Sequence, residues 1–136
     1  ALADPDWTTP HFTWGEFASK DGSEFTGGKV SNGQTRLNVL FLMWKLEALR
    51  KKAGERPIRI RSGFRSVAHN QEVGGASNSM HLYGVAADIV VDGHTPSGVA
   101  SLAKTCGFSG VKAYTGHVHI DSRIQYPYGS QSWWWP

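Results

Sequence analysis

Cysteine is nearly absent from this 136-residue chain, and long apolar runs are absent altogether. The single cysteine, Cys106, cannot form an internal disulfide, which excludes a small disulfide-stapled scaffold. It follows a helical pattern, where we expect a small buried hydrophobe rather than a nucleophile. No stretch approaches the roughly eighteen apolar residues of a membrane span, and no positively charged leader with an apolar stretch is present. We therefore expect no membrane span and, if the protein is exported, its mature form.

Charged residues are also sparse, at 18% of the chain, and the formal net charge is only +3. A mildly basic protein suits an anionic polymer as partner, and nucleic acid is the competing partner of that kind. The basic residues cluster at Arg50–Lys52 and between Arg56 and Arg65, partly at a predicted helix end, where cations favour the helix dipole. We therefore expect a solvated basic face and no nucleic-acid partner.

Length and periodicity predict one small α+β domain, residues 1–136, and we expect a monomer. The chain contains no internal repeat and no low-complexity linker. Residues 32–53 place apolar side chains at helical spacing, and Gly54 follows as a stop signal. The expected buried stripe of this helix consists of Leu37, Leu40, Phe41, Trp44 and Ala48.

The remaining elements are short and predict a small antiparallel sheet packed against helices. Residues 57–61 alternate as a half-buried strand does and lead Arg65 into a loop. Aromatic residues near both ends, including Phe12, Phe17 and Trp133–Trp135, are expected to pack onto the body of the domain. The other predicted elements are helices at 66–73 and 95–106, a strand at 86–91, and a hairpin of 111–114 with 117–121.

Histidine and aspartate recur at a spacing that predicts a metal site. His81 lies seven residues before Asp88, and a second run carries His117, His119 and Asp121. Zinc takes imidazole nitrogen and carboxylate oxygen, and a catalytic zinc keeps one position open for water. His81, Asp88 and His119 would supply three ligands and His117 a base, whereas an isolated HxH pair is weak evidence.

Two further roles stay open on the residues alone. On a strand, His117, His119 and Asp121 face one side, so Asp121 could replace His117 as the base or orient a ligand histidine. Arg65 offers a planar fork of donors for a carboxylate, but it could equally form a structural salt bridge. Ser79 and Tyr83 could bind substrate or position His81, and polar loop residues are often only turn formers.

The central segment resembles a known family. The run from Ser62 to Ser66, followed by Asn70 and then by Val73 to Asp88, is similar to the zinc D-Ala-D-Ala carboxypeptidases of actinobacterial type. These peptidoglycan peptidases share a metal site with lysostaphin and hedgehog. The resemblance implies a hedgehog/DD-peptidase-like fold, Zn²⁺ bound by His81, Asp88 and His119, and Arg65 holding the C-terminal carboxylate of the substrate.

The resemblance also implies a function. We expect a secreted or wall-associated metallopeptidase that hydrolyses D-Ala-D-Ala or related bonds in the stem peptides of peptidoglycan. In this mechanism His117 takes a proton from water and passes it to the leaving amine; imidazole suits the task because its ordinary pKa, about 6.5, lies near operating pH. The alternatives are an endopeptidase acting on cross-links or on an L-Ala-D-Glu bond, and a non-catalytic zinc module that binds wall peptides.

Overall fold

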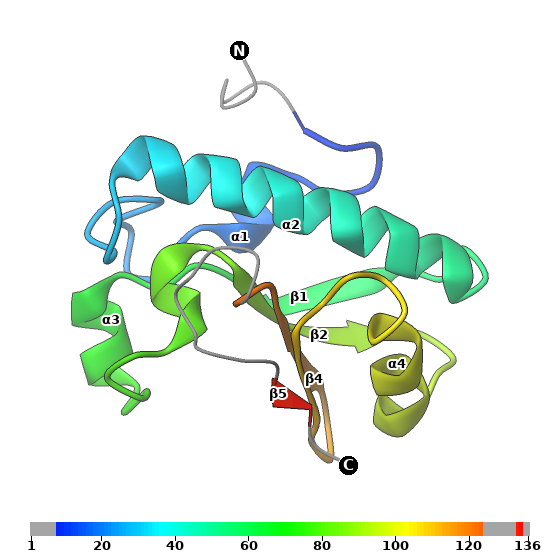
Figure 1. Ribbon diagram of the computed structural model, residues 1–136. Helices are drawn as coiled ribbons and strands as arrows, with labels where there is room; N and C mark the ends of the chain where they lie inside the picture. Colours follow the sequence, from blue (N-terminus) through cyan, green and yellow to red (C-terminus); the bar gives the residue numbers. More distant parts are fainter. Residues whose placement is uncertain (1–7, 124–132, 135–136) are drawn as a thin grey trace.

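A computed structural model describes residues 8–123 and 133–134 of the chain. The order of elements is α1(Trp14–Phe17), α2(Asn32–Lys52), β1(Ile58–Ser62), α3(Val67–Glu72), η1(Met80–Tyr83), β2(Ala86–Val91), α4(Pro96–Ala103), β3(Gly110–Ala113), β4(Val118–Asp121) and β5(Trp133–Trp134). The long helix α2 crosses one face of the sheet, with α3 and α4 toward opposite ends (Figure 1). The predicted α+β class is confirmed.

The sheet has the strand order β1-β2-β4-β3-β5. Its first four strands are antiparallel, as predicted, and β3 and β4 form the predicted hairpin. The short strand β5 pairs parallel to β3, which the sequence did not indicate. Only the backbone of Trp133 and Trp134 is described, and Trp135 lies outside the described residues, so the predicted packing of these side chains stays a prediction.

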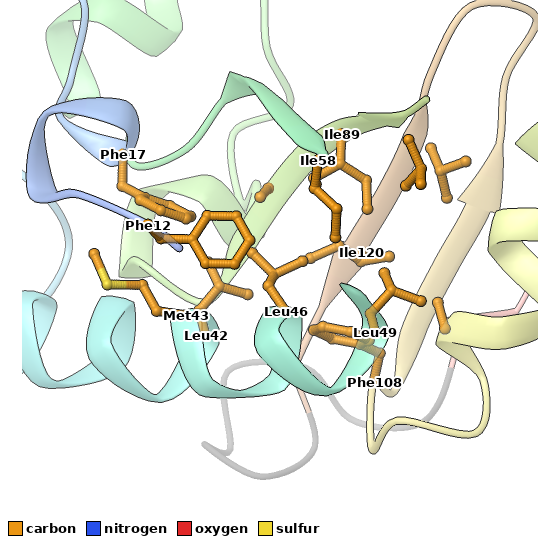
Figure 2. Close-up of a cluster of buried hydrophobic side chains, with 14 of the residues drawn as sticks. Phe12, Phe17, Leu42, Met43, Leu46, Leu49, Ile58, Ile89, Phe108 and Ile120 are labelled. Atoms are coloured by element: carbon orange, nitrogen blue, oxygen red, sulfur yellow. The ribbon is translucent and has the colours of Figure 1, made fainter. Parts of the chain in front are cut away.

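The core lies between α2 and the sheet. Side chains of Leu42, Met43, Leu46 and Leu49 meet strand residues such as Ile89 and Ile120 (Figure 2). Phe12 and Phe17 pack at the edge of this cluster, as predicted. Apolar burial of this kind contributes roughly 25 cal/mol per Å² and is the main driving force for folding.

The predicted buried stripe of α2 is wrong in part. Leu40 is buried and Leu37 half-buried, but Phe41, Trp44 and Ala48 are exposed, Trp44 to 51%. Apolar residues surround most of this helix, so several stripes at helical spacing were compatible with the sequence. The stripe that meets the sheet is Val39, Leu42, Met43, Leu46 and Leu49.

Strand alternation separates the core from the opposite face. On β2, Ala87 and Ile89 are buried against α2, while Asp88 between them points to the other side. The neighbouring strand β4 repeats the pattern, since Val118 and Ile120 enter the core and His119 does not. The face of the sheet that α2 does not cover therefore carries the titratable side chains of Asp88 and His119.

Two smaller expectations have mixed outcomes. Helix α4 begins after the predicted Thr95 cap but ends at Ala103, three residues before Cys106, and a turn with Gly107 in the left-handed region follows. Cys106 packs against the core, but it is half-buried rather than buried as expected. Among the described residues, no helix combines the length and apolar character needed to cross a membrane.

Candidate metal centre

His81 is held in place by a single turn of 3-10 helix. The Ser79 side chain accepts a hydrogen bond from the His81 backbone N–H at the start of η1, and Gly84 ends the turn in the left-handed region, with φ 80°. A Cβ on Gly84 would also lie 2.9 Å from the carbonyl oxygen of Thr35, so only glycine fits there. The buried imidazole donates from Nδ1 to the carbonyl oxygen of Gly63 at 2.7 Å. Its Nε2 lone pair is therefore directed away from this bond, free to bind a cation.

Asp88 and His119 are direct cross-strand partners on β2 and β4. Asp88 Oδ1 lies 3.4 Å from His81 Nε2 and 3.1 Å from His119 Nδ1. The three ligand atoms all lie within 4.8 Å of one another. A tetrahedron with bonds of about 2.0 Å has edges of about 3.3 Å, so the spacing of these atoms fits zinc. Two imidazoles and one carboxylate are also the donor set of a zinc site with an open position.

Asp121 orients His119, the second ligand histidine. Its buried carboxylate accepts a hydrogen bond from His119 Nε2 at 2.8 Å, which leaves Nδ1 directed toward Asp88. Arg123 Nη2 donates to the same carboxylate at 2.7 Å. Gly110 is the register partner of Asp121, and a Cβ there would collide with the carboxylate. A glycine on β3 thus makes the room in which this carboxylate is buried.

The charge states of the cluster follow from burial and these bonds. Burial lowers the pKa of His81, and Asp88 offsets this only in part. Burial also opposes ionisation of Asp88, but the neighbouring imidazoles of His119 and His81 hold its pKa far below the ordinary value. Burial would likewise lower the pKa of His119, yet the adjacent carboxylates of Asp121 and Asp88 raise it. Asp121 is ionised as well, because His119 and Arg123 outweigh burial and lower its pKa to about 2.

A cavity of about 340 Å³ opens over the cluster. His81, Asp88 and His119 line it together with His117 and Arg65. The Arg65 guanidinium is half-buried; burial lowers its pKa and the Asp88 charge opposes that shift. Its Nε is buried without a hydrogen-bond partner. A guanidinium that lines a cavity is a group placed to receive an anion.

The structure brings most of the predicted site residues together. His117 precedes β4 rather than lying on it, and its ring stacks on Tyr114 with centroids 4.6 Å apart. Ser79 lines the cavity, whereas Tyr83 does not; its hydroxyl donates to Asn78, which does.

Sequence reasoning missed three polar residues that line the cavity, Tyr114, Asn78 and Arg123. Arg123 lies beyond the end of β4, so the strand period that placed Asp121 beside His119 did not reach it. Tyr114 could have been placed next to His117 from the predicted hairpin. Asn78 carried no signal in the sequence, because the path of its loop depends on the contacts of the whole fold.

A second cluster of possible ligands lies on the surface. Asp21, His69 and Glu72 also place ligand atoms within 4.8 Å of one another. His69 and Glu72 lie on α3, and Asp21 approaches from the loop before α2. The Asp21 carboxylate already accepts hydrogen bonds from Ser66 and Ser23 hydroxyls, which lower its pKa.

Comparison with known proteins agrees with this geometry. Residues 10–121 match the model of the family described as Peptidase M15. A curated protein of Streptomyces albus G, "Zinc D-Ala-D-Ala carboxypeptidase", is 41% identical over 124 residues, 88% of this chain and 48% of that protein. The chain thus spans about half the length of this relative. The family match covers the cavity residues from Arg65 to His119, and the resemblance drawn from the sequence is confirmed: the chain belongs to the peptidase M15 family.

Proposed function

We propose that this protein is a zinc-dependent carboxypeptidase that hydrolyses the D-Ala-D-Ala bond of peptidoglycan stem peptides. The observation that carries the proposal is one cavity that combines a zinc-type donor set with a half-buried arginine. The name of the Streptomyces relative, zinc D-Ala-D-Ala carboxypeptidase, supports the same activity. Wall peptides as substrate would place the action of the protein outside the membrane.

His81, Asp88 and His119 would hold the zinc ion. When bound, zinc supplies Lewis acidity to the carbonyl group of the bond to be cut and acidifies the attacking water. The Gly63 carbonyl and the Asp121 carboxylate fix the tautomers of the two histidines, so that each directs a lone pair at the metal position. These outer hydrogen bonds keep the ligands oriented.

His117 is the proposed general base. Its imidazole borders the same cavity as the metal ligands, where it could take a proton from the attacking water and return it to the leaving amine. Asp121, the alternative, is fully buried, and its oxygens are engaged by His119 and Arg123. The burial and the bonds of Asp121 support a positioning role for it, which favours His117 as the base.

Arg65 is the proposed anchor for the terminal carboxylate. A guanidinium presents two parallel N–H donors that match a carboxylate, and Arg65 lines the same cavity as the metal ligands. The backbone N–H of Arg65 donates to the His81 carbonyl at 3.1 Å, so the loop after β1 is fixed to the metal-bearing turn. A substrate held by its C-terminus would then present its last peptide bond to the zinc. Ser79, at the cavity wall, is a candidate for a further polar contact.

The test compares a pentapeptide stem ending in free D-Ala-D-Ala with the same peptide amidated at its C-terminus. We expect kcat/KM to fall about 10- to 100-fold on amidation, because a charge-assisted hydrogen bond is worth ~1.5–3 kcal/mol. Arg65→Ala should slow only the free acid and so narrow the gap. Arg56→Ala, which removes an exposed arginine outside this cavity, is the matched control.

The outcomes separate the alternatives. Equal cleavage of both peptides by the wild type would mean that Arg65 does not read a C-terminus, and an endopeptidase would become the better interpretation. Binding of the peptide by the zinc-loaded protein without any hydrolysis would instead indicate the non-catalytic wall-binding module. Mass spectrometry of the products identifies the bond that is cut in either case.

A further inference from the structure

We infer that Arg59 and Arg61 form a second anion subsite, which binds a carboxylate on the N-terminal side of the bond to be cut. This inference rests on the proposed function and extends it to a substrate class, peptides that carry an acidic residue upstream of the scissile bond. Its basis is the pair of cavities that continue from the metal cluster along β1 and β2, on the face of the sheet that α2 does not cover.

The sheet register brings the arginines to this face. Arg59 pairs with Val90, and its neighbours Ile58 and Ile60 pack into the core, so its side chain points the other way. The pairing of β1 with β2 is irregular between Ile60 and Ser62, with Arg61 at the irregularity. Bulges of this kind often re-aim a side chain next to an active site.

The cavities adjoin the metal cluster. One of about 210 Å³ is lined by Arg61 and Ser62 together with Asp88 and His117, which also line the central cavity. The next, of about 250 Å³, is lined by Arg59, Arg61, Val90 and Gly116. A path therefore leads from Arg65 past the metal ligands and His117 to Arg61, and from there to Arg59.

Charge is poorly neutralised at this end of the path. The Arg59 side chain is 71% exposed, and its ion pair with Asp92 is long, at 3.9 Å. Arg61 Nη1 donates to the neutral carbonyl oxygen of Gly116 at 3.4 Å, and Lys20 Nζ, another cation, donates to the Arg61 carbonyl. Asp88, the carboxylate that lines the cavity together with Arg61, is already engaged by two histidines. A pair of guanidinium groups in this setting selects an anion.

The order of groups along the path fixes which part of the substrate would meet them. A peptide whose terminal carboxylate is held by Arg65 must place its last bond over the metal ligands. Its preceding residues then run past Asp88 and His117 toward Arg61. The path has cations at both ends and the hydrolytic groups in between, which suits a peptide with one terminal and one upstream carboxylate.

The test uses two D-Ala-D-Ala peptides that differ only in one upstream side chain, glutamate in one and glutamine in the other. We expect the zinc-loaded wild type to prefer the glutamate peptide about fivefold in kcat/KM at low salt, the size of an exposed ion pair. The preference should lie in KM with kcat unchanged, because the contact is the same in the ground and transition states. It should also shrink at 0.5 M salt, which screens exposed charges.

Arg61→Gln should abolish most of this preference, Arg59→Gln should reduce it, and both variants should cleave the glutamine peptide like the wild type. Arg56→Gln is the matched control and should keep the preference. Equal KM for the two peptides in the wild type, with both cleaved, overturns the subsite alone and leaves the proposed function intact. Failure to cleave either peptide overturns both. A preference that survives in the Arg59→Gln/Arg61→Gln double variant also overturns the subsite.

Discussion

Among the described residues, two clusters of histidine and carboxylate place their ligand atoms within 4.8 Å of one another, but they differ in how firmly those ligands are oriented. His81, Asp88 and His119 come from three separate elements and line a cavity over the sheet. In the surface cluster, Asp21 and Glu72 are exposed and only His69 is half-buried. The difference lies in what holds the ligands, since each histidine of the first cluster has its second nitrogen engaged by a fixed acceptor.

A hydrogen bond to the ring nitrogen that does not face the metal position matters, because an unrestrained imidazole must lose rotamer and tautomer freedom when it binds a metal. The buried cluster has lost that freedom in folding. In the surface cluster, Asp21 is committed to serine hydroxyls, and the His69 Nδ1 atom is buried without a partner. The residues of the surface cluster therefore meet without being oriented for a metal, and the following changes test that contrast.

The largest effect is expected from removing a ligand. His81→Ala should no longer retain one zinc per chain and should lose about 10³-fold or more in activity, because metal polarisation supplies several kcal/mol of transition-state stabilisation. Elemental analysis of the purified protein measures the zinc. The matched change His69→Ala should leave both quantities as in the wild type. Unchanged zinc content in His81→Ala would refute the assignment of the buried cluster.

The next largest effect separates holding the metal from using it. His117→Ala should keep zinc but lose about 10²- to 10⁴-fold in kcat, the usual contribution of general base catalysis. Steady-state kinetics on the free-acid pentapeptide, with zinc content measured on the same samples, checks both halves. If this variant hydrolyses at nearly the wild-type rate while Asp121→Asn does not, the roles of the two residues are reversed.

A smaller effect should follow from loosening the outer hydrogen bonds. Asp121→Asn should weaken zinc binding about 10- to 100-fold, as is typical when the partner of a ligand histidine is changed. Gly110→Ala, which places a methyl group against the Asp121 carboxylate, should weaken it in the same direction without altering any ligand. Competition with a chromophoric chelator gives the affinities. Wild-type affinity in both variants would show that orientation of His119 is not what distinguishes the buried cluster.

The smallest effect is expected at the surface cluster. Glu72→Gln removes an exposed carboxylate, so the free energy of unfolding should change by less than about 0.5 kcal/mol. The zinc content should stay at one ion per chain. It is measured after the protein has been titrated with zinc and the excess ion has been removed. A second zinc in the wild type that disappears in Glu72→Gln would mean that proximity of ligands is sufficient for metal binding in this protein.

Much of this molecule was accessible from the sequence because its signals are local. Alternating and helical patterns located α2, β1, α3, β2 and the β3–β4 hairpin, and the same period of two placed His119 and Asp121 on one face. The types and spacing of His81, Asp88 and His119 pointed to zinc before any geometry was known. Period and ligand type are properties of neighbouring residues, so they could be interpreted without knowing the fold.

The tertiary structure decided the contacts between segments that lie far apart in the sequence. The face of α2 that is buried depended on where the sheet lies, because apolar residues occur on several sides of the helix. The acceptor for His81 is a backbone carbonyl eighteen positions earlier in the chain, at Gly63, and a carbonyl leaves no mark in a sequence. The adjoining cavities that lead from Arg65 and the metal cluster to Arg61 likewise exist only after β1 and β2 pair, because folding alone brings together side chains that the chain holds far apart.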